Sequence, residues 1–216
     1  VEIASDLGRL AYRLDMKPVA EKLFRLYLDK HPDSFENSNN LACALRDQGR
    51  FDEAIAVLRP AIERRPDNAM LWNTLGTVLS AQGDPAGAQT FFDEALRFDP
   101  KFAKARYNRG NSRLALGDLD QALDDCNLAL TQTTLPEERA MIRLARSTIQ
   151  IANGAIAEGW TDYEARLDPQ LAGTTHFVID RPIWTHGADL AGKSLLLMGE
   201  QGLGDEVLFA NIMPDL

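Results

Sequence analysis

The sequence contains little cysteine or histidine and fewer basic than acidic residues, and each shortage excludes a class of protein. Its two cysteines, Cys43 and Cys126, lie far apart and lack metal-site spacing, which favours packing thiols in a reducing compartment. Neither His176 nor His186 has a cysteine or carboxylate at ligand spacing, so we expect no metal site. The net charge of −9 argues against a nucleic acid as partner, because such partners need a basic protein surface.

Long apolar runs are also missing. No stretch approaches the roughly 18 consecutive apolar residues that a membrane-spanning helix needs, and no charged-then-apolar signal sequence opens the chain. We therefore expect no membrane span and a cytoplasmic location. With 216 residues and 45% hydrophobic residues, the chain has the composition of a soluble globular protein and is long enough to bury a core.

Four kinds of residue recur at a step of 34 positions over the first three quarters of the sequence. They are Pro32, Pro66 and Pro100; Ala20, Ala54, Ala88 and Ala122; Phe24, Leu58, Phe92 and Cys126; and Gly49, Gly83 and Gly117. Each unit holds two segments with apolar residues at three- and four-residue spacing, which predicts two amphipathic helices separated by the glycine. One such pair cannot bury its apolar face alone, so we expect the pairs to stack into a solenoid.

The expected units lie near 1–34, 35–68, 69–102 and 103–136, with a degenerate fifth unit at 137–167 that we expect to cap the stack. Two residues depart from the pattern. Asp15 stands where the other units carry the central glycine. Pro60 lies inside the second helix of its unit and is expected to bend or shorten that helix, at a cost of about 3 kcal/mol.

Residues 69–102 carry Trp, Leu-Gly, Gly, Ala, Phe, Ala and Pro in the order of the tetratricopeptide repeat, and residues 103–130 match the same positions closely. The chain resembles that family over residues 1–167. The resemblance implies an all-α superhelical solenoid of four to five helix-turn-helix repeats. It also implies that the first helix of each repeat lines a concave groove, in which a protein or an extended peptide binds.

Polar residues on these first helices are the candidate groove residues. They are Asn39, Asn40, Asn73, Thr77, Tyr107, Asn108 and Asn111. An asparagine amide both donates and accepts, so a ladder of amides suits an extended peptide backbone, and the arrangement resembles in part the asparagine ladder of O-GlcNAc transferase. The alternative is that these residues are solvated or make hydrogen bonds between helices. A carboxylate clamp is disfavoured, because only Lys104 stands at a suitable position.

Arginines occupy positions of the fourth and fifth units where large apolar residues usually pack. They are Arg106, Arg109, Arg113, Arg143 and Arg146. One interpretation is a basic stripe for an acidic partner. The favoured one is that their stems pack while their charged heads pair with carboxylates. The expected partners are Asp118, Asp120, Asp124, Asp125 and Glu164.

The sequence changes character after residue 167. Residues 168–193 are rich in Gly, Pro and Thr and are expected to form a linker. The apolar run SLLLMGE at 194–200 predicts a buried parallel strand, followed by a glycine loop and the start of a helix. This order predicts the first β-loop-α of a truncated α/β domain over 194–216. An isolated strand leaves its edge unpaired, so we also expect self-association through residues 194–200 or packing of this strand on the last helices.

Trp184, Gly187 and the motif EQGLGDE at 200–206 resemble bacterial proteins that join tetratricopeptide repeats to a heptosyltransferase-like glycosyltransferase domain. The resemblance implies that Asp205 is the catalytic base of the full-length protein, with Gly202 and Gly204 in the acceptor loop and a nucleotide-sugar donor. The fragment itself is expected to bind no cofactor and to be inactive, with the rest of the domain beyond Leu216. The alternatives are that Asp205 caps a helix, and that the protein is a non-enzymatic scaffold.

Overall fold

The computed structural model describes residues 2–171, 180, 189 and 191–194. The chain divides into two units, Val1–Leu171 and Ala172–Leu216, and almost all described residues belong to the first. Apart from Ser194, the predicted strand, loop and helix of 194–216 lie outside the described residues. The same holds for Gly202, Gly204 and Asp205, so their roles stay predictions.

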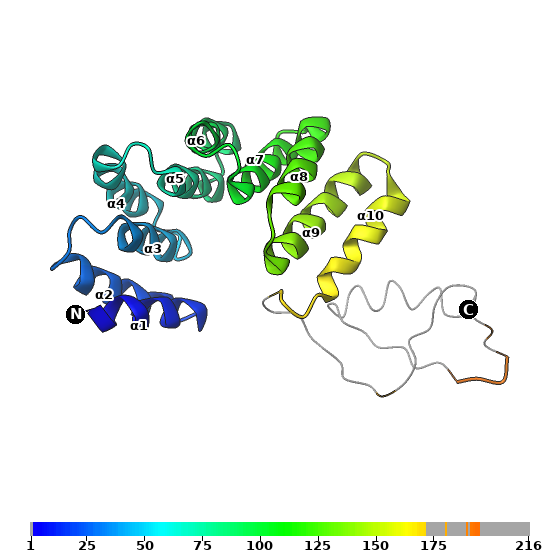
Figure 1. The fold of residues 1–216 in the computed structure, drawn as a ribbon, viewed down its shortest axis with the longest axis horizontal. Helices are drawn as coiled ribbons and strands as arrows, with labels where there is room; N and C mark the ends of the chain where they lie inside the picture. The colour runs from blue at the N-terminus through cyan, green and yellow to red at the C-terminus, as the bar shows by residue number, and fades with distance from the viewer. Residues whose placement is uncertain (1, 172–179, 181–188, 190, 195–216) are drawn as a thin grey trace. The chain divides into compact units, whose positions relative to one another are not determined.

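The described residues form five pairs of α-helices and contain no strand, which confirms the predicted helical solenoid (Figure 1). The first helices of the pairs are α1 (Glu2–Arg13), α3 (Phe35–Arg46), α5 (Ala69–Gln82), α7 (Ala103–Ala115) and α9 (Pro136–Ala152). The second helices are α2 (Lys17–Leu28), α4 (Phe51–Arg64), α6 (Pro85–Phe98), α8 (Leu119–Gln132) and α10 (Ile156–Tyr163), which continues into a 3₁₀ helix (Glu164–Leu167). Within this described part, no helix is both long and apolar enough to cross a membrane.

Glycine follows the first helix in four of the five pairs. Gly49, Gly83, Gly117 and Gly154 have φ angles between 73° and 93°, in the left-handed region that glycine adopts without steric cost. Asp15 takes the same place in the first pair with a φ of 60°, a conformation that aspartate tolerates better than most residues. The first pair therefore keeps its turn without the glycine.

Pro60 lies inside α4 without ending it. The helix runs for 14 residues, Phe51–Arg64, so Pro60 does not shorten it, and the alternative of a bend stays a prediction. Neighbouring Leu58, Ala61 and Ile62 are buried in the core. Burial of their apolar surface outweighs the cost of about 3 kcal/mol that a proline imposes on a helix interior.

The two helices of a pair approach closely where a glycine faces a large side chain. A Cβ atom placed on Gly76 would lie 2.5 Å from Cε1 of Phe92, and one on Gly8 would lie 2.6 Å from Cε1 of Phe24. Both distances are shorter than carbon atoms can approach, so only glycine fits there. The second pair has Ala42 at this position, and the smaller Leu58 replaces the phenylalanine.

Each first helix also packs against the second helix of the preceding pair, so the pairs form a continuous stack. One core cluster joins α1 to α5, and another joins α7 to α9. The apolar side chains at the stacking faces are dry, with Leu41, Leu71 and Val78 at most 2% exposed. Burial of these faces is the main stabilising contribution to the stack.

The fifth pair covers the fourth but does not end the stack with a polar face. Ile156, Trp160 and Leu167 are between 46% and 50% exposed. Whether this pair caps the stack stays a prediction.

Replacing Gly76 with Ala is expected to lower the free energy of unfolding by about 1–3 kcal/mol, because the new methyl group collides with the Phe92 ring. A Gly-to-Ala change elsewhere in a helix stabilises by about 0.5–1 kcal/mol, so a loss isolates the collision. Phe92→Leu in the same chain recreates the combination of Ala42 and Leu58 and should recover most of this loss. Urea titrations of the wild type, both single variants and the double variant measure the coupling; strictly additive effects would contradict the packing described.

Candidate functional site: a pocket on the first helices

An open pocket of about 330 Å³ lies on the first helices of the second, third and fourth pairs. Its lining comprises Arg46, Thr77, Ser80, Ala81, Phe92, Asn108 and Asn111. The lining therefore contains three of the seven predicted groove residues, namely Thr77, Asn108 and Asn111. Four residues of the lining were not predicted.

Arg46 supplies the positive charge of the pocket. Its Nη1 donates to the hydroxyl of Thr77 at 2.9 Å, and its Nη2 lies 2.7 Å from a carboxylate oxygen of Asp47. Burial opposes the charged form of Arg46, but the neighbouring Cys43 and Asp47 hold its pKa above the ordinary value. The guanidinium is therefore charged, and its direction is fixed by two partners.

Two polar groups of the pocket have no hydrogen-bond partner among the described residues. They are the Ser80 hydroxyl on α5 and the Asn111 amide on α7, and both side chains are partly exposed. Phe92 also belongs to the lining, although its side chain is only 1% exposed because its ring packs against Gly76. A cation and unused hydrogen-bonding groups in one pocket suit a polar chain.

Asn39 and Asn73 are buried between helices and do not line the pocket. The Thr74 hydroxyl donates to Oδ1 of Asn39 at 2.5 Å, and Nδ2 of Asn108 donates to Oδ1 of Asn73 at 2.8 Å. Each bond joins two successive first helices through residues 35 positions apart. These two asparagines thus make the hydrogen bonds between helices that the sequence left open as an alternative.

The remaining two predicted residues lie elsewhere. Asn40 is half-buried and outside the pocket lining. Tyr107 packs against the core cluster that joins α7 to α9. Whether the seven residues contact a ligand stays a prediction, but only three of them share this pocket.

The repeat pattern could have predicted two of the pocket residues that the sequence analysis missed. Arg46 and Ser80 lie one 34-residue step apart, and each follows a predicted or equivalent groove position, Cys43 or Thr77, by three residues. Residues three apart on a helix share a face, so the face could have been extended by one turn. Phe92 gave no such signal, since its position is that of a core residue.

Both cysteines are free and act as packing residues, as the sequence predicts. Burial raises the pKa of the Cys126 thiol to about 12 and also raises that of Cys43. Neutral, buried thiols are poor nucleophiles. Among the described residues there is also no group of three or more metal-binding side chains.

Comparison with known proteins identifies the helix pairs. A model of the tetratricopeptide repeat family matches residues 39–101 and 73–135. The helix pairs of residues 39–135 match tetratricopeptide repeats. A thermophilic tetratricopeptide repeat protein from Thermus thermophilus has the same fold, with a TM-score of 0.70 at 22% identity over 77% of this chain and 90% of that chain.

Two relatives share more of the sequence. Protein FlbA of Caulobacter vibrioides is 50% identical over 214 residues, 99% of this chain and 36% of FlbA, so the chain spans about a third of that relative's length. A peroxisomal targeting signal receptor of Candida albicans is 36% identical over 74 residues, 34% of this chain and 12% of the receptor. Neither relative is named as a glycosyltransferase, and the predicted fusion to one stays a prediction.

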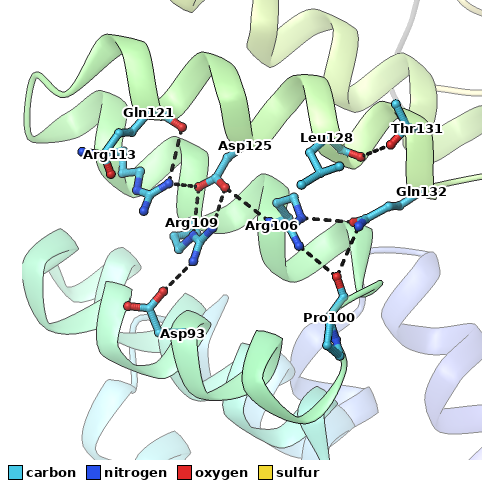
Figure 2. A network of polar contacts seen from close by, with 10 residues as sticks. All are labelled: Asp93, Pro100, Arg106, Arg109, Arg113, Gln121, Asp125, Leu128, Thr131 and Gln132. Atoms are coloured by element: carbon cyan, nitrogen blue, oxygen red, sulfur yellow. Dashed lines mark hydrogen bonds and ion pairs between the residues drawn. The ribbon is translucent and has the colours of Figure 1, made fainter.

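A charged network joins α7 to α8 within the fourth repeat and reaches α6 of the third (Figure 2). Asp125 on α8, with a side chain only 4% exposed, accepts from Nε and Nη2 of Arg109 at 2.9 and 2.6 Å and from Nη1 of Arg113 at 2.6 Å. Nη1 of Arg109 also reaches Asp93 on α6 at 2.6 Å. Arg109 corresponds to Leu75 one repeat earlier. An ion-pairing side chain therefore occupies a position that is apolar in the third repeat.

Figure 2 also shows how Arg106 completes the network from the same helix. Its Nε donates to Oε1 of Gln132 at 3.1 Å and its Nη2 donates to the Pro100 carbonyl at 2.8 Å. Burial, and then repulsion from Arg109, lower the pKa of Arg106. The heads of these arginines are thus used within the protein, as the favoured interpretation states.

The fifth repeat contains a second pairing of the same kind. Nε of Arg146 donates to Asp162 at 2.5 Å, and Nε of Arg143 donates to the same carboxylate at 3.1 Å. Burial alone would raise the pKa of Asp162, but these two hydrogen bonds hold it below the ordinary value. Among the five carboxylates expected to pair, only Asp125 is in these networks, while Asp93 and Asp162 were not predicted.

Asp125→Asn is expected to lower the free energy of unfolding by about 3–5 kcal/mol, because it leaves three guanidinium groups partly buried around a neutral amide. The matched control is Asp124→Asn, one residue earlier and exposed, which should change the free energy by less than about 0.5 kcal/mol. Both values come from urea unfolding followed by circular dichroism. Equal effects of the two substitutions would show that the buried carboxylate does not brace the repeats.

Proposed function

We propose that this chain is a protein-interaction module that holds an extended peptide segment of a partner protein on the first helices of its second to fourth repeats. The observation that carries the proposal is the pocket lined by Arg46, Thr77, Ser80, Asn108 and Asn111 over the ring of Phe92. Its polar groups come from three successive repeats, so a bound chain would cross α3, α5 and α7.

The chemistry of the lining fits a peptide. The Asn111 amide can donate to a backbone carbonyl and accept from a backbone N–H of the same peptide unit. Ser80 offers a further donor and acceptor on the neighbouring helix. Arg46 favours a carbonyl or carboxylate oxygen.

The comparisons support recognition of a protein segment. The Candida albicans relative is named as a receptor for a targeting signal, and its similarity to this chain extends over 74 residues. Bound partners of this chain would be proteins or peptides. A nucleic acid partner is not proposed, because the net charge is −9.

A finer proposal is that the module recruits an acceptor protein to a fused, nucleotide-sugar-dependent glycosyltransferase domain in the cytoplasm. Its support is the motif at 200–206 with Asp205, which lies outside the described residues. The chain spans 36% of FlbA, so a further domain has room in a protein of that length. The second candidate is a non-enzymatic scaffold, which the exposed apolar side chains at both ends of the stack favour.

Selection of random short peptides displayed on phage tests the groove without a known partner. We expect the wild type to enrich a family of sequences, and Ser80→Ala with Asn111→Ala to bind these peptides about tenfold or more weakly. Each lost hydrogen bond accounts for about 1 kcal/mol of this change. Fluorescence polarisation of one enriched peptide measures the affinities.

The matched control is Thr90→Ala, which removes an exposed hydroxyl from α6, away from the pocket lining. It should leave the affinity unchanged. Asn73→Ala separates the two roles of asparagine: it should lower stability through its lost bond to Asn108 and affect affinity less than the pocket variants. Enriched peptides that bind the Ser80 and Asn111 variant as tightly as the wild type would rule the pocket out.

A further inference from the structure

The first helix of the stack presents an apolar face to solvent. Ile3, Leu7, Leu10 and Leu14 lie on or directly after α1 at spacings of four, three and four residues, and are between 47% and 70% exposed. This spacing places the four side chains on one side of the helix. An apolar stripe of this kind on a soluble domain marks an interaction surface.

The internal repeats show what covers this face. Leu7 corresponds to Leu41 and Leu75 at steps of 34 residues, and both are at most 9% exposed. Leu10 corresponds to Ala44 and Val78, which are fully buried. In the internal repeats, the first helix packs against the second helix of the preceding repeat. The face of α1 therefore fits a second helix of the same family.

The other end of the stack presents the complementary face. Counted from the central glycines Gly117 and Gly154, Ile156, Trp160 and Leu167 correspond to Leu119, Leu123 and Leu130 of the fourth repeat. Those three leucines pack in the core cluster with Ile142 and Ile149 of α9. Their counterparts on α10 and the 3₁₀ helix are half-exposed, so the half of the junction that would receive a following first helix is open.

Both ends of the stack carry exposed charged residues, and those of α1 and its following turn are of both signs, with Asp6 and Asp15 beside the arginines. The exposed residues of α1 include Arg9 and Arg13, and within the described part of the chain Arg9 pairs only with Asp6. The exposed residues at the other end include Glu158. An attraction between Glu158 of one copy and Arg13 of the next would favour the head-to-tail orientation.

We propose that copies of this chain associate head to tail, with the α10 end of one copy packed on the α1 face of the next. The chain carries both halves of the junction that already holds its own repeats together. A contact between two different faces does not close on itself as a two-fold dimer does, so the assembly grows with concentration. The proposal is independent of the peptide pocket, which lies on α3, α5 and α7 and not at either end of the stack.

Sedimentation velocity of the full 216-residue chain and its variants tests this arrangement. The wild type should show a weight-average mass that rises with concentration above the 23.9 kDa of one chain. Leu7→Glu and Trp160→Glu should each be monomeric, because each places a charge in one half of the junction. An equimolar mixture of the two variants should form a one-to-one dimer and nothing larger, because each variant keeps the half that the other has lost.

Leu128→Glu is the matched control, because Leu128 is 44% exposed on α8 and lies in neither end face. It should assemble as the wild type does, and circular dichroism should show the same helix content for all variants. A monomeric wild type over the whole concentration range overturns the proposal. So does a mixture that stays monomeric, or a Trp160→Glu variant that dimerises alone, which would mean that α1 pairs with α1.

Discussion

The close approach of the two helices within a repeat is the constraint on which the rest of the structure depends. At Gly76 the two helices come so near that any side chain would collide with Phe92, so the ring fills the space that a side chain would occupy. The ring then serves two purposes. It closes the core of the third repeat, where it is 1% exposed, and it also belongs to the lining of the candidate binding pocket. Local packing and the shape of the site therefore have the same cause.

Stacking of the pairs also depends on small and large residues at fixed positions, but the interactions at the junctions between pairs change along the chain. From α1 to α5 the junctions are apolar and share one core cluster. Between α6, α7 and α8 a buried carboxylate and three arginines add to a small apolar cluster of Ala95, Leu96 and Ala105, and the apolar core divides. Ion pairs with directed hydrogen bonds fix the relative orientation of the helices, whereas apolar contacts permit small shifts between them. The repeats that carry Asn108 and Asn111 are thus held in register with those that carry Thr77 and Ser80.

The 34-residue step predicted the helices, their turns and their stacking, because these depend on residue size and backbone conformation at fixed positions. The groove was harder to predict. Asn39 and Thr77 both lie on first helices. The Asn39 side chain points toward the neighbouring first helix, whereas that of Thr77 points into the pocket. The position of each residue around its helix axis decides between the two environments. Asp93 could not be foreseen as a partner of Arg109, since their pairing depends on the angle between successive repeats. The sequence also did not predict that α4 continues through Pro60, because tertiary packing decides whether that helix ends.

The central claim is that a peptide crosses the first helices at the pocket above Phe92. Chemical-shift perturbation in two-dimensional NMR spectra, on titration with a peptide selected for binding, tests this most directly. The account predicts the largest shifts at the backbone amides of Thr77, Ser80 and Asn111 and at the Phe92 ring. Shifts confined to exposed positions of the second helices, such as Thr90 and Leu128, with the pocket unaffected, would contradict it.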